Sequence, residues 1–454
     1  MAKTVAAIST PQNTGGIGII RISGEEAIEI ADKIFVSTGS RNLSQLKGYS
    51  AAHGYIYYKN EKVDECVALV FRAPKSYTGE NVVELSCHGG LFVLRRVLRA
   101  VFEAGAVPAE AGEFTKRAFL NGKIDLTEAE AVMGIIGAQG EQGAKAALTA
   151  LDGALSKKIA SLNAVLLSAA ANMSAWVDYP DDEIEELSDE KLLSDLCFVR
   201  DELSSLLSNF DAGSAITKGV ETAIVGKPNV GKSALMNLLS GFSRSIVTDI
   251  EGTTRDVVEQ TVNLGSLLLH LADTAGIRET EDVVESIGVG RAKEKIERAG
   301  LILAVFDRSK ELSEEDEEIL SLCRNKRAIA VINKSDLECK ADLEKIKAAI
   351  PYSIDLCALS GDGLKALEEI SEKLLCVSEL DTSAAMLSTE RQRKNTTEAY
   401  NAVCEAIDCV NFGVTMDAVN VCIDSAISSL LEMTGEKATE AVVNQVFSQF
   451  CVGK

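Results

Sequence analysis

A glycine-rich loop between an apolar run and a helix-forming stretch constrains this chain more than any other segment. It reads Gly226-Lys-Pro-Asn-Val-Gly-Lys-Ser233 and fits G-x-x-x-x-G-K-[ST] at every specified position. The run 222–225 before it has the length of a strand, and apolar residues at helical spacing follow it. The glycines let successive N–H groups converge on one anion, and the next helix adds its positive dipole end. The segment predicts a phosphate site in an α/β domain, with Lys232 on the β- and γ-phosphates and Ser233 on Mg²⁺.

Later segments, each after an apolar run of strand length, point to the metal ion and the base. Asp273-Thr-Ala-Gly276 follows the run 268–272, so its carboxylate would hold Mg²⁺ through water and its glycine would let the chain approach the γ-phosphate. Asn333-Lys-Ser-Asp336 follows the run 329–332. The Asp336 carboxylate can accept both N1–H and N2–H₂ of guanine, whereas adenine lacks the second donor, so the site would select GTP.

The same pattern assigns supporting roles around the nucleotide. Asn333 would fix the base loop, and the stem of Lys334 would cover the face of the ring. The backbone of Cys357-Ala-Leu359 would meet the guanine O6. The residues expected to contact GTP are Asn229, Val230, Gly231, Lys232, Ser233, Ala234, Thr248, Asp249, Ile250, Glu251, Gly252, Thr253, Thr254, Asp273, Thr274, Ala275, Gly276, Asn333, Lys334, Ser335, Asp336, Cys357, Ala358 and Leu359.

One substitution bears on the rate of hydrolysis. Ras-like proteins orient the attacking water with a glutamine directly after the D-x-x-G motif, and here that position is Ile277. Hydrolysis is therefore slow without help, or the help comes from elsewhere. Asn229 and the run Thr248–Thr254 supply oxygens for a monovalent cation, which would offset the charge that an arginine finger otherwise neutralises. Thr254 is the expected second hydroxyl ligand of Mg²⁺, and Glu285 and Arg278 would orient water. Lys232 and Glu285 are the catalytic candidates.

Size and composition place the chain among soluble globular proteins of two or three domains. It has 454 residues, 46% of them hydrophobic and 25% charged. No apolar run reaches the length of a membrane span, and the first residues lack the apolar stretch of a signal peptide. The eleven cysteines include no C-x-x-C pair, which favours reduced, mostly buried thiols in a cytoplasmic protein. A net charge of −22 means that nucleic acid would be held only through local basic patches.

The pattern along the chain divides it into four stretches. Residues 1–120 read as mixed α/β, with strands near 4–8, 18–22, 67–71 and 82–85 and helices near 25–35 and 91–102. Residues 121–215 are helical, with a heptad-like seam from Leu192 to Phe210 that Asp211-Ala-Gly-Ser214 should end. Residues 216–378 hold the nucleotide motifs, and helices resume over 379–454. The predicted fold class is multidomain α/β plus all-α: a mixed α/β N-terminal domain, a helical domain formed by two separated segments, and an inserted Ras-like P-loop G domain.

Several further motifs occur in this order beside the GTPase segments. They are Gly15-Gly-Ile-Gly-Ile-Ile-Arg-Ile-Ser-Gly24, Ser76-Tyr-Thr-Gly-Glu80, Glu84-Leu-Ser-Cys-His-Gly-Gly90, Gly112-Glu-Phe-Thr-Lys-Arg-Ala-Phe-Leu-Asn-Gly-Lys-Ile-Asp-Leu126, Thr248–Asp256 and the terminal Phe450-Cys-Val-Gly-Lys454. With them the chain resembles, from end to end, the MnmE (TrmE) family of tRNA-modification GTPases. Ala111 departs from the proline expected before Gly112.

The resemblance implies a function in tRNA modification. Family members work with a flavin-dependent partner, MnmG, on C5 of the wobble uridine (U34), adding an aminomethyl or carboxymethylaminomethyl group whose one-carbon unit comes from a tetrahydrofolate. The N-terminal domain forms a homodimer and binds 5-formyltetrahydrofolate or a related folate, at positions matching Arg21, Glu84, Lys123 and Lys454.

The resemblance also distributes the metal ions and the hydrolytic residues. It implies that K⁺ is bound by Asn229, Thr248, Ile250 and Thr253 and that Mg²⁺ is bound by Ser233 and Thr254. It also implies that Glu285 orients the attacking water. Two G domains would meet across the dimer when GTP is bound, which would give activity without a glutamine.

Two other functions are compatible with the motifs. One is a regulatory switch of the ribosome-assembly type, in which the GTP state controls RNA binding and no base is altered. The other is a folate-binding module whose GTPase controls only its oligomeric state. A pure switch needs no one-carbon donor, so binding of 5-formyltetrahydrofolate separates it from the enzyme subunit, and unchanged wobble nucleosides in cells lacking the protein would identify the module.

Overall fold

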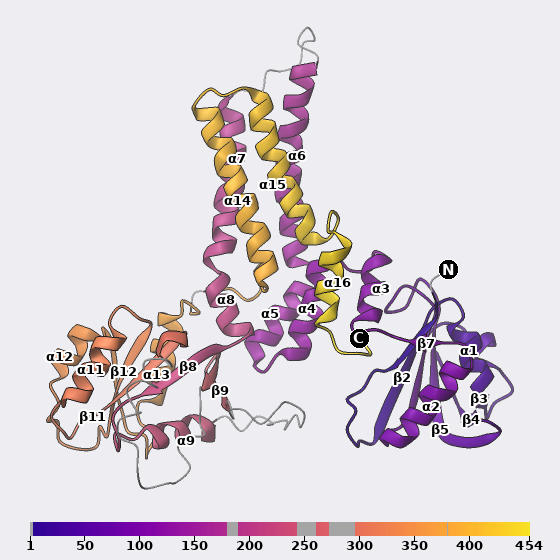
Figure 1. Ribbon diagram of the computed structural model, residues 1–454, viewed down its shortest axis with the longest axis horizontal. Helices are drawn as coiled ribbons and strands as arrows, with labels where there is room; N and C mark the ends of the chain where they lie inside the picture. Colours follow the sequence, from indigo (N-terminus) through magenta and orange to yellow (C-terminus); the bar gives the residue numbers. More distant parts are fainter. Residues whose placement is uncertain (1–2, 179–188, 243–259, 272–295, 379) are drawn as a thin grey trace. The chain divides into compact units, whose positions relative to one another are not determined.

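The computed structural model describes residues 3–178, 189–242, 260–271, 296–378 and 380–454, and of 174–178 and 242 only the backbone (Figure 1). The chain forms two compact units, each built from separate segments. The first unit comprises Met1–Met133, Ser156–Val199 and Glu398–Lys454, and the second comprises Gly134–Leu155 and Arg200–Thr397. Within the described ranges, no helix is both long and apolar enough to cross a membrane.

The first unit opens with a seven-stranded sheet in the order β3-β4-β5-β6-β2-β1-β7. Its pairs are antiparallel except for β1 with β7. The predicted mixed α/β character of this part is confirmed. The strands are β1 Val5–Ile8, β2 Ile17–Ser23, β3 Phe35–Ser37, β4 Ser50–Tyr58, β5 Glu61–Phe71, β6 Val82–His88 and β7 Val107–Pro108.

The two faces of this sheet are covered differently. Helices α1 (Ala27–Ile34) and α2 (Leu91–Glu103) bury apolar stripes against one face, where Ile20 and Ile22 of β2 point. Because side chains alternate along a strand, Arg21 points to the other face. There α3 (Glu113–Leu120) packs Phe114 against Val5 and Ala7 of β1. A short 3₁₀ helix, η1, spans Leu43–Gln45.

Long helices make up the rest of the first unit and continue into the second. They are α4 Leu126–Gly137, α6 Ala154–Asp178, α7 Asp189–Ser208, α14 Glu390–Asn411, α15 Met416–Thr434 and α16 Glu440–Ser448. Their buried residues recur three or four positions apart, as in Leu155, Ile159, Leu162 and Leu166 of α6. The first unit contains parts of both helical stretches that the sequence predicts as one domain.

The second unit holds a six-stranded sheet in the order β13-β12-β11-β8-β10-β9, parallel except for the edge strand β9. The strand order reverses at β8, and such switch points are where open α/β sheets bind ligands. The elements are β8 Val220–Val225, α9 Lys232–Phe242, β9 Gln260–Leu264, β10 Leu267–Leu271, β11 Leu301–Asp307, α11 Glu314–Cys323, β12 Ala328–Asn333, α12 Leu343–Ala349, β13 Tyr352–Leu356 and α13 Leu364–Leu374.

Two shorter helices, α5 (Glu141–Leu151) and α8 (Phe210–Thr217), also belong to the second unit. The expectation that Asp211-Ala-Gly-Ser214 ends the helical seam is wrong, because these residues lie inside α8. Ala212, Ala215 and Ile216 are buried in one core with strands of the sheet. Their burial outweighs the weak helix propensity of the glycine.

The cysteines are all free thiols, but most are not buried. Only Cys66, Cys87, Cys323 and Cys357 are buried, so the expectation of mostly buried thiols is wrong. Several of the others lie on the helices α14 and α15, where one side of each helix stays partly open to solvent.

Candidate functional site

The glycine loop connects the carboxyl end of β8 to the first residue of α9, as the motif requires. Gly231 has φ +101° and Asn229 has φ +63°, both in the left-handed region. A Cβ on Gly231 would lie 2.1 Å from Nδ2 of Asn333. The loop is therefore in direct contact with the segment predicted to read the base.

Lys232 lies across the loop. Its Nζ donates to the carbonyl oxygens of Gly226 and Lys227, both at 2.7 Å. Ser233 and Ala234 follow in the first turn of α9, where Ser233 is exposed. The Lys232 ammonium and the Ser233 hydroxyl thus lie next to a loop whose N–H groups can bind an anion. Val230, in contrast, is buried and forms part of the core beneath the loop.

Asn333 joins the predicted phosphate loop to the predicted base loops. Its buried side chain donates from Nδ2 to the Val230 carbonyl (2.8 Å), and its Oδ1 accepts from the Ala358 N–H (3.0 Å). The structure therefore brings residues 229–234, 333–336 and 357–359 together at one edge of the sheet.

The base loop leaves a carboxylate in solvent. Asp336 is exposed, and its Oδ1 lies 3.4 Å from the Cys357 thiol, while the Ser335 N–H donates to the Leu356 carbonyl. Leu359 is almost fully exposed. A solvent-exposed carboxylate beside two backbone segments can accept the paired donors of a guanine edge.

Asp307, which sequence reasoning missed, lies at the centre of this site. Its Oδ2 accepts from Lys334 Nζ at 2.6 Å, and its Oδ1 accepts from the Ser309 N–H and hydroxyl. Burial alone would raise the pKa of Asp307, but the hydrogen bonds from Lys334 and Ser309 outweigh it and hold the pKa below its ordinary value. The signal was an acidic residue directly after the apolar run 301–306.

The remaining nucleotide candidates lie outside the described residues. They are Thr248, Asp249, Ile250, Glu251, Gly252, Thr253, Thr254, Asp273, Thr274, Ala275, Gly276 and Glu285.

The folate candidates lie on the sheet face opposite α1 and α2. Arg21 and Glu84 are directly paired across β2 and β6. The Arg21 Nε donates to Glu84 Oε1 at 2.9 Å, and a terminal guanidinium nitrogen lies 2.8 Å from the same oxygen. The two side chains are 15% and 19% exposed. The guanidinium lies 5.2 Å from the ring centroid of Tyr77 and 5.5 Å from that of Phe114.

The chain end and Lys123 approach the same face. The Phe114 N–H donates to the Lys454 carbonyl (3.1 Å), and Val452 forms a β-bridge with Ala111. The Lys123 stem lies against the turn that carries Tyr77, because a Cβ on Gly79 would be 3.4 Å from Lys123 Cγ. Arg21 thus lies beside the Tyr77 and Phe114 rings and is paired with Glu84, the Lys454 backbone is bonded to Phe114, and the Lys123 stem is next to Gly79.

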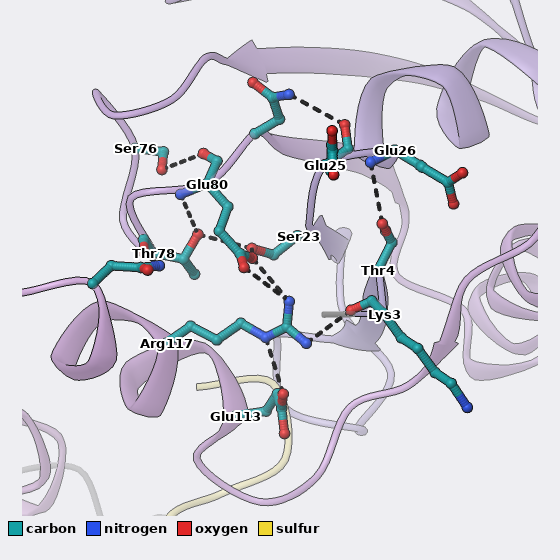
Figure 2. A network of polar contacts seen from close by, with 12 residues as sticks. Lys3, Thr4, Ser23, Glu25, Glu26, Ser76, Thr78, Glu80, Glu113 and Arg117 are labelled. Carbon is teal, nitrogen blue, oxygen red and sulfur yellow. Dashed lines mark hydrogen bonds and ion pairs between the residues drawn. The ribbon is translucent and has the colours of Figure 1, made fainter. Parts of the chain in front are cut away.

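Arg117 of α3 contacts several of the loops next to these residues (Figure 2). Its buried guanidinium donates to Glu113, to both carboxylate oxygens of Glu80 and to the Lys3 carbonyl. Glu80 also accepts from the Ser23 hydroxyl at 2.8 Å. Two of the sequence motifs, Ser76–Glu80 and the one from Gly112 to Leu126, therefore include residues that tie α3 to the sheet.

Comparisons with known proteins agree with these features. Residues 4–123 match the family model of the GTP-binding protein TrmE N-terminus, and residues 126–451 match that of the MnmE helical domain. Three relatives are each named tRNA modification GTPase MnmE: that of Alkaliphilus oremlandii is 42% identical, that of Acetivibrio thermocellus 39% and that of Lactococcus lactis subsp. cremoris MG1363 41%. The matches cover 99% of this chain and 98–99% of each relative. The predicted fold class is confirmed, and the chain belongs to the MnmE family of tRNA-modification GTPases.

Proposed function

We propose that this protein is the GTP-hydrolysing subunit of a complex that modifies C5 of the wobble uridine of tRNA. It would add an aminomethyl or carboxymethylaminomethyl group with a one-carbon unit from a tetrahydrofolate, together with an MnmG partner. One observation carries the nucleotide part: the Asn333 side chain bonds to Val230 of the P-loop and to Ala358, so the phosphate loop and the guanine-reading carboxylate of Asp336 belong to one site.

The chain's own residues would divide the work on GTP. The P-loop N–H groups and Lys232 bind the β- and γ-phosphates, and Lys232 offsets the negative charge that develops during transfer. Ser233 and Thr254 would hold Mg²⁺, which would supply positive charge at the phosphates, and the exposed position of Ser233 at the loop's end fits that role. Glu285 would hold the attacking water in line.

K⁺ is the second ion we assign to this site. Asn229, at the exposed tip of the P-loop, would provide one ligand, and Thr248, Ile250 and Thr253 the others. A bound monovalent cation would offset the negative charge that an arginine finger neutralises in other GTPases. GTP hydrolysis should accelerate in K⁺ relative to Na⁺ at equal ionic strength, and equal rates would remove the cation from the mechanism.

The folate proposal rests on the Arg21–Glu84 face. A pterin offers an amide-like edge to the Glu84 carboxylate, which is paired with Arg21 and remains 19% exposed. The Tyr77 ring, which is 36% exposed, would provide an apolar wall, and Lys123 and Lys454 would meet the folate's carboxylates or formyl oxygen. Titration with 5-formyltetrahydrofolate should show binding that Arg21→Ala weakens. No binding would favour a regulatory GTPase switch that alters no base.

A homodimer through the N-terminal domain is supported by the apolar character of this sheet face. Ile17 and Val67 are 68% and 42% exposed, and Ile19 and Leu69 are partly exposed beside them. The strand register places these residues on the face that carries Arg21. Exposed apolar patches of this kind commonly form symmetric interfaces. Sedimentation should therefore give a dimer that Val67→Asp dissociates.

The decisive experiment for the whole proposal is nucleoside analysis of tRNA. Cells with the protein should carry the C5 modification at U34, and cells without it, or with Asp273→Ala, should lack it. Identical wobble nucleosides in all three strains would instead favour a folate-binding module whose GTPase controls only its oligomeric state.

A further inference from the structure

The Lys334 ammonium has two partners on opposite sides of the nucleotide site. It donates to Asp307 Oδ2 at 2.6 Å and to the backbone carbonyl of Asn229 at 3.3 Å. Asp307 ends β11, and Asn229 is in the P-loop. Lys334, whose aliphatic stem is predicted to cover the guanine, therefore contacts the phosphate loop through its ammonium group.

Asp307 is placed to hold that ammonium. The β11–β12 register sets it directly beside Asn333, the residue before Lys334, and its side chain is 1% exposed. Its other oxygen is fixed by the Ser309 N–H (3.0 Å) and hydroxyl (2.7 Å). A buried carboxylate with both oxygens engaged has little freedom to turn, so it fixes the position of its partner.

The backbone of Asn229, which accepts the second hydrogen bond from Lys334, has a strained conformation. Asn229 has φ +63°, a left-handed conformation that a non-glycine residue keeps only when its surroundings hold it. The peptide unit whose oxygen accepts from Lys334 follows directly from this Cα. Its orientation, and with it the direction of the exposed Asn229 side chain, therefore depends on where the ammonium lies.

We propose that Asp307 is a positioning residue that holds Lys334 so that one side chain both covers the guanine and braces Asn229, which links base binding to the monovalent-cation site. This rests on the proposed function, in which Asn229 contributes to the K⁺ site. Without the Asp307 carboxylate, the Lys334 ammonium would move toward solvent. The Lys334 stem would then no longer cover the base, and the Asn229 carbonyl would lose its hydrogen bond.

The test is Asp307→Asn in the full-length protein, an isosteric change that removes the charge. We expect GDP release to accelerate by on the order of tenfold, as for the loss of a charged hydrogen bond. The K⁺ concentration for half-maximal GTP hydrolysis should rise several-fold. If both quantities stay at wild-type values, or if only the maximal rate falls, the positioning role is wrong.

Two further variants separate positioning from general damage. Asp316→Asn removes the other buried acid that braces the P-loop, which pairs with Lys227 at 2.5 Å, and it should leave the K⁺ requirement unchanged. An equal rise in that variant would contradict the proposal. Wild-type protein without K⁺ stimulation would refute the cation part of the proposed function, whereas the GDP-release measurement would still decide the role of Asp307.

A double-mutant cycle keeps the test usable if Asp307→Asn folds poorly. Lys334→Met keeps the stem but removes the ammonium, and the double variant Asp307→Asn/Lys334→Met leaves no unpaired charge. If Asp307 acts only through Lys334, GDP release from the double variant should equal that from Lys334→Met alone. Additive effects of the two substitutions would overturn the inference.

Discussion

Gly231 shows how much of the nucleotide site depends on one missing side chain. The Asn333 amide, which joins the P-loop to the base loops, approaches this Cα so closely that a Cβ would lie 2.1 Å from Nδ2. The residue also has φ +101°, which side-chain-bearing residues rarely adopt. Gly231 therefore serves two purposes: it lets the loop turn, and it leaves room for the Asn333 amide to contact the loop.

Gly231→Ala should for this reason abolish tight nucleotide binding. The strain of the left-handed backbone and the displaced Asn333 together predict a loss of GDP affinity of at least about tenfold, measured by titration with a fluorescent GDP analogue. Gly241→Ala, near the end of the helix that follows, is the matched control, because no atom of the described residues lies within 4 Å of its added Cβ. It should leave binding unchanged, and a similar loss there would contradict the explanation.

His88, in the predicted motif Glu84–Gly90, gives a pH-dependent contact. Its Nδ1 lies 2.6 Å from Asp64 Oδ1, and this hydrogen bond, with the Asp64 charge, raises the pKa of His88 above its ordinary 6.5. A raised pKa means that the ion pair stabilises the fold fully below the unfolded-state pKa. The stabilisation is lost as pH rises through the folded-state pKa.

NMR titration should therefore show His88 deprotonating above pH 6.5, and Asp64→Asn should move the transition back toward 6.5. Glu65→Gln should shift it less, because the Glu65 charge contributes least to the raised pKa. An unchanged His88 transition in Asp64→Asn would show that the contact does not control its protonation.

At the residue scale, the motifs could be predicted from the sequence, but the side-chain contacts that connect them could not. Lys232, Asn333 and Lys334 follow from spacing and chemistry alone. Asp307 could not be identified as a partner of Lys334, because the two meet only through the register of β11 with β12. Likewise, Arg117 belongs to a recognised motif, yet its buried contacts with Glu80 and Lys3 depend on how α3 docks on the sheet.

At the element scale, strong apolar runs were predicted well and weak ones were missed. The helices over 27–34 and 91–103 and the strands at 220–225 and 328–333 follow their patterns. Strand β4, Ser50–Tyr58, was missed because its small and polar residues give little alternation, and its burial comes from its neighbours. Gly54 in it lies under the Phe35 ring, with a Cβ position 2.5 Å from Cζ, which no local pattern reveals.

The C-terminal tail is an element whose docking depends on backbone rather than on its side chains. Gly453 has φ +102°, and a Cβ there would lie 2.3 Å from the Ile8 carbonyl oxygen. Its neighbours Val452 and Lys454 bond through their backbones to Ala111 and Phe114. The tail thereby closes onto β1 and the first turn of α3.

Gly453→Ala should detach the tail and lower the free energy of unfolding by about 1–3 kcal/mol, the cost of a strained backbone. Urea denaturation followed by circular dichroism measures it. Lys454→Ala leaves the backbone contacts in place, so its effect should stay within about 0.5 kcal/mol. If the two variants are equally stable, the tail is not held as described.

At the scale of the whole molecule, separate chain segments combine into each compact unit. The two helical stretches suggested one domain interrupted by another, and the first unit contains parts of both. The place where the nucleotide domain begins was harder to predict. The boundary proposed at residue 216 falls inside α8, Phe210–Thr217, because helical spacing does not tell which neighbour a helix packs against.

That placement predicts how far the nucleotide domain extends as a folding unit. Ala212, Ala215 and Ile216 share a buried core with Leu267 and Leu269 of β10. A fragment of residues 209–378 should therefore be more stable than one of 219–378, by about 2–4 kcal/mol from the apolar surface that α8 covers. Chemical denaturation of both fragments with GDP absent measures the difference in the free energy of unfolding. Ile216→Ala in the longer fragment should remove part of this difference. Equal stabilities would mean that α8 is a connector and that the nucleotide domain is complete without it.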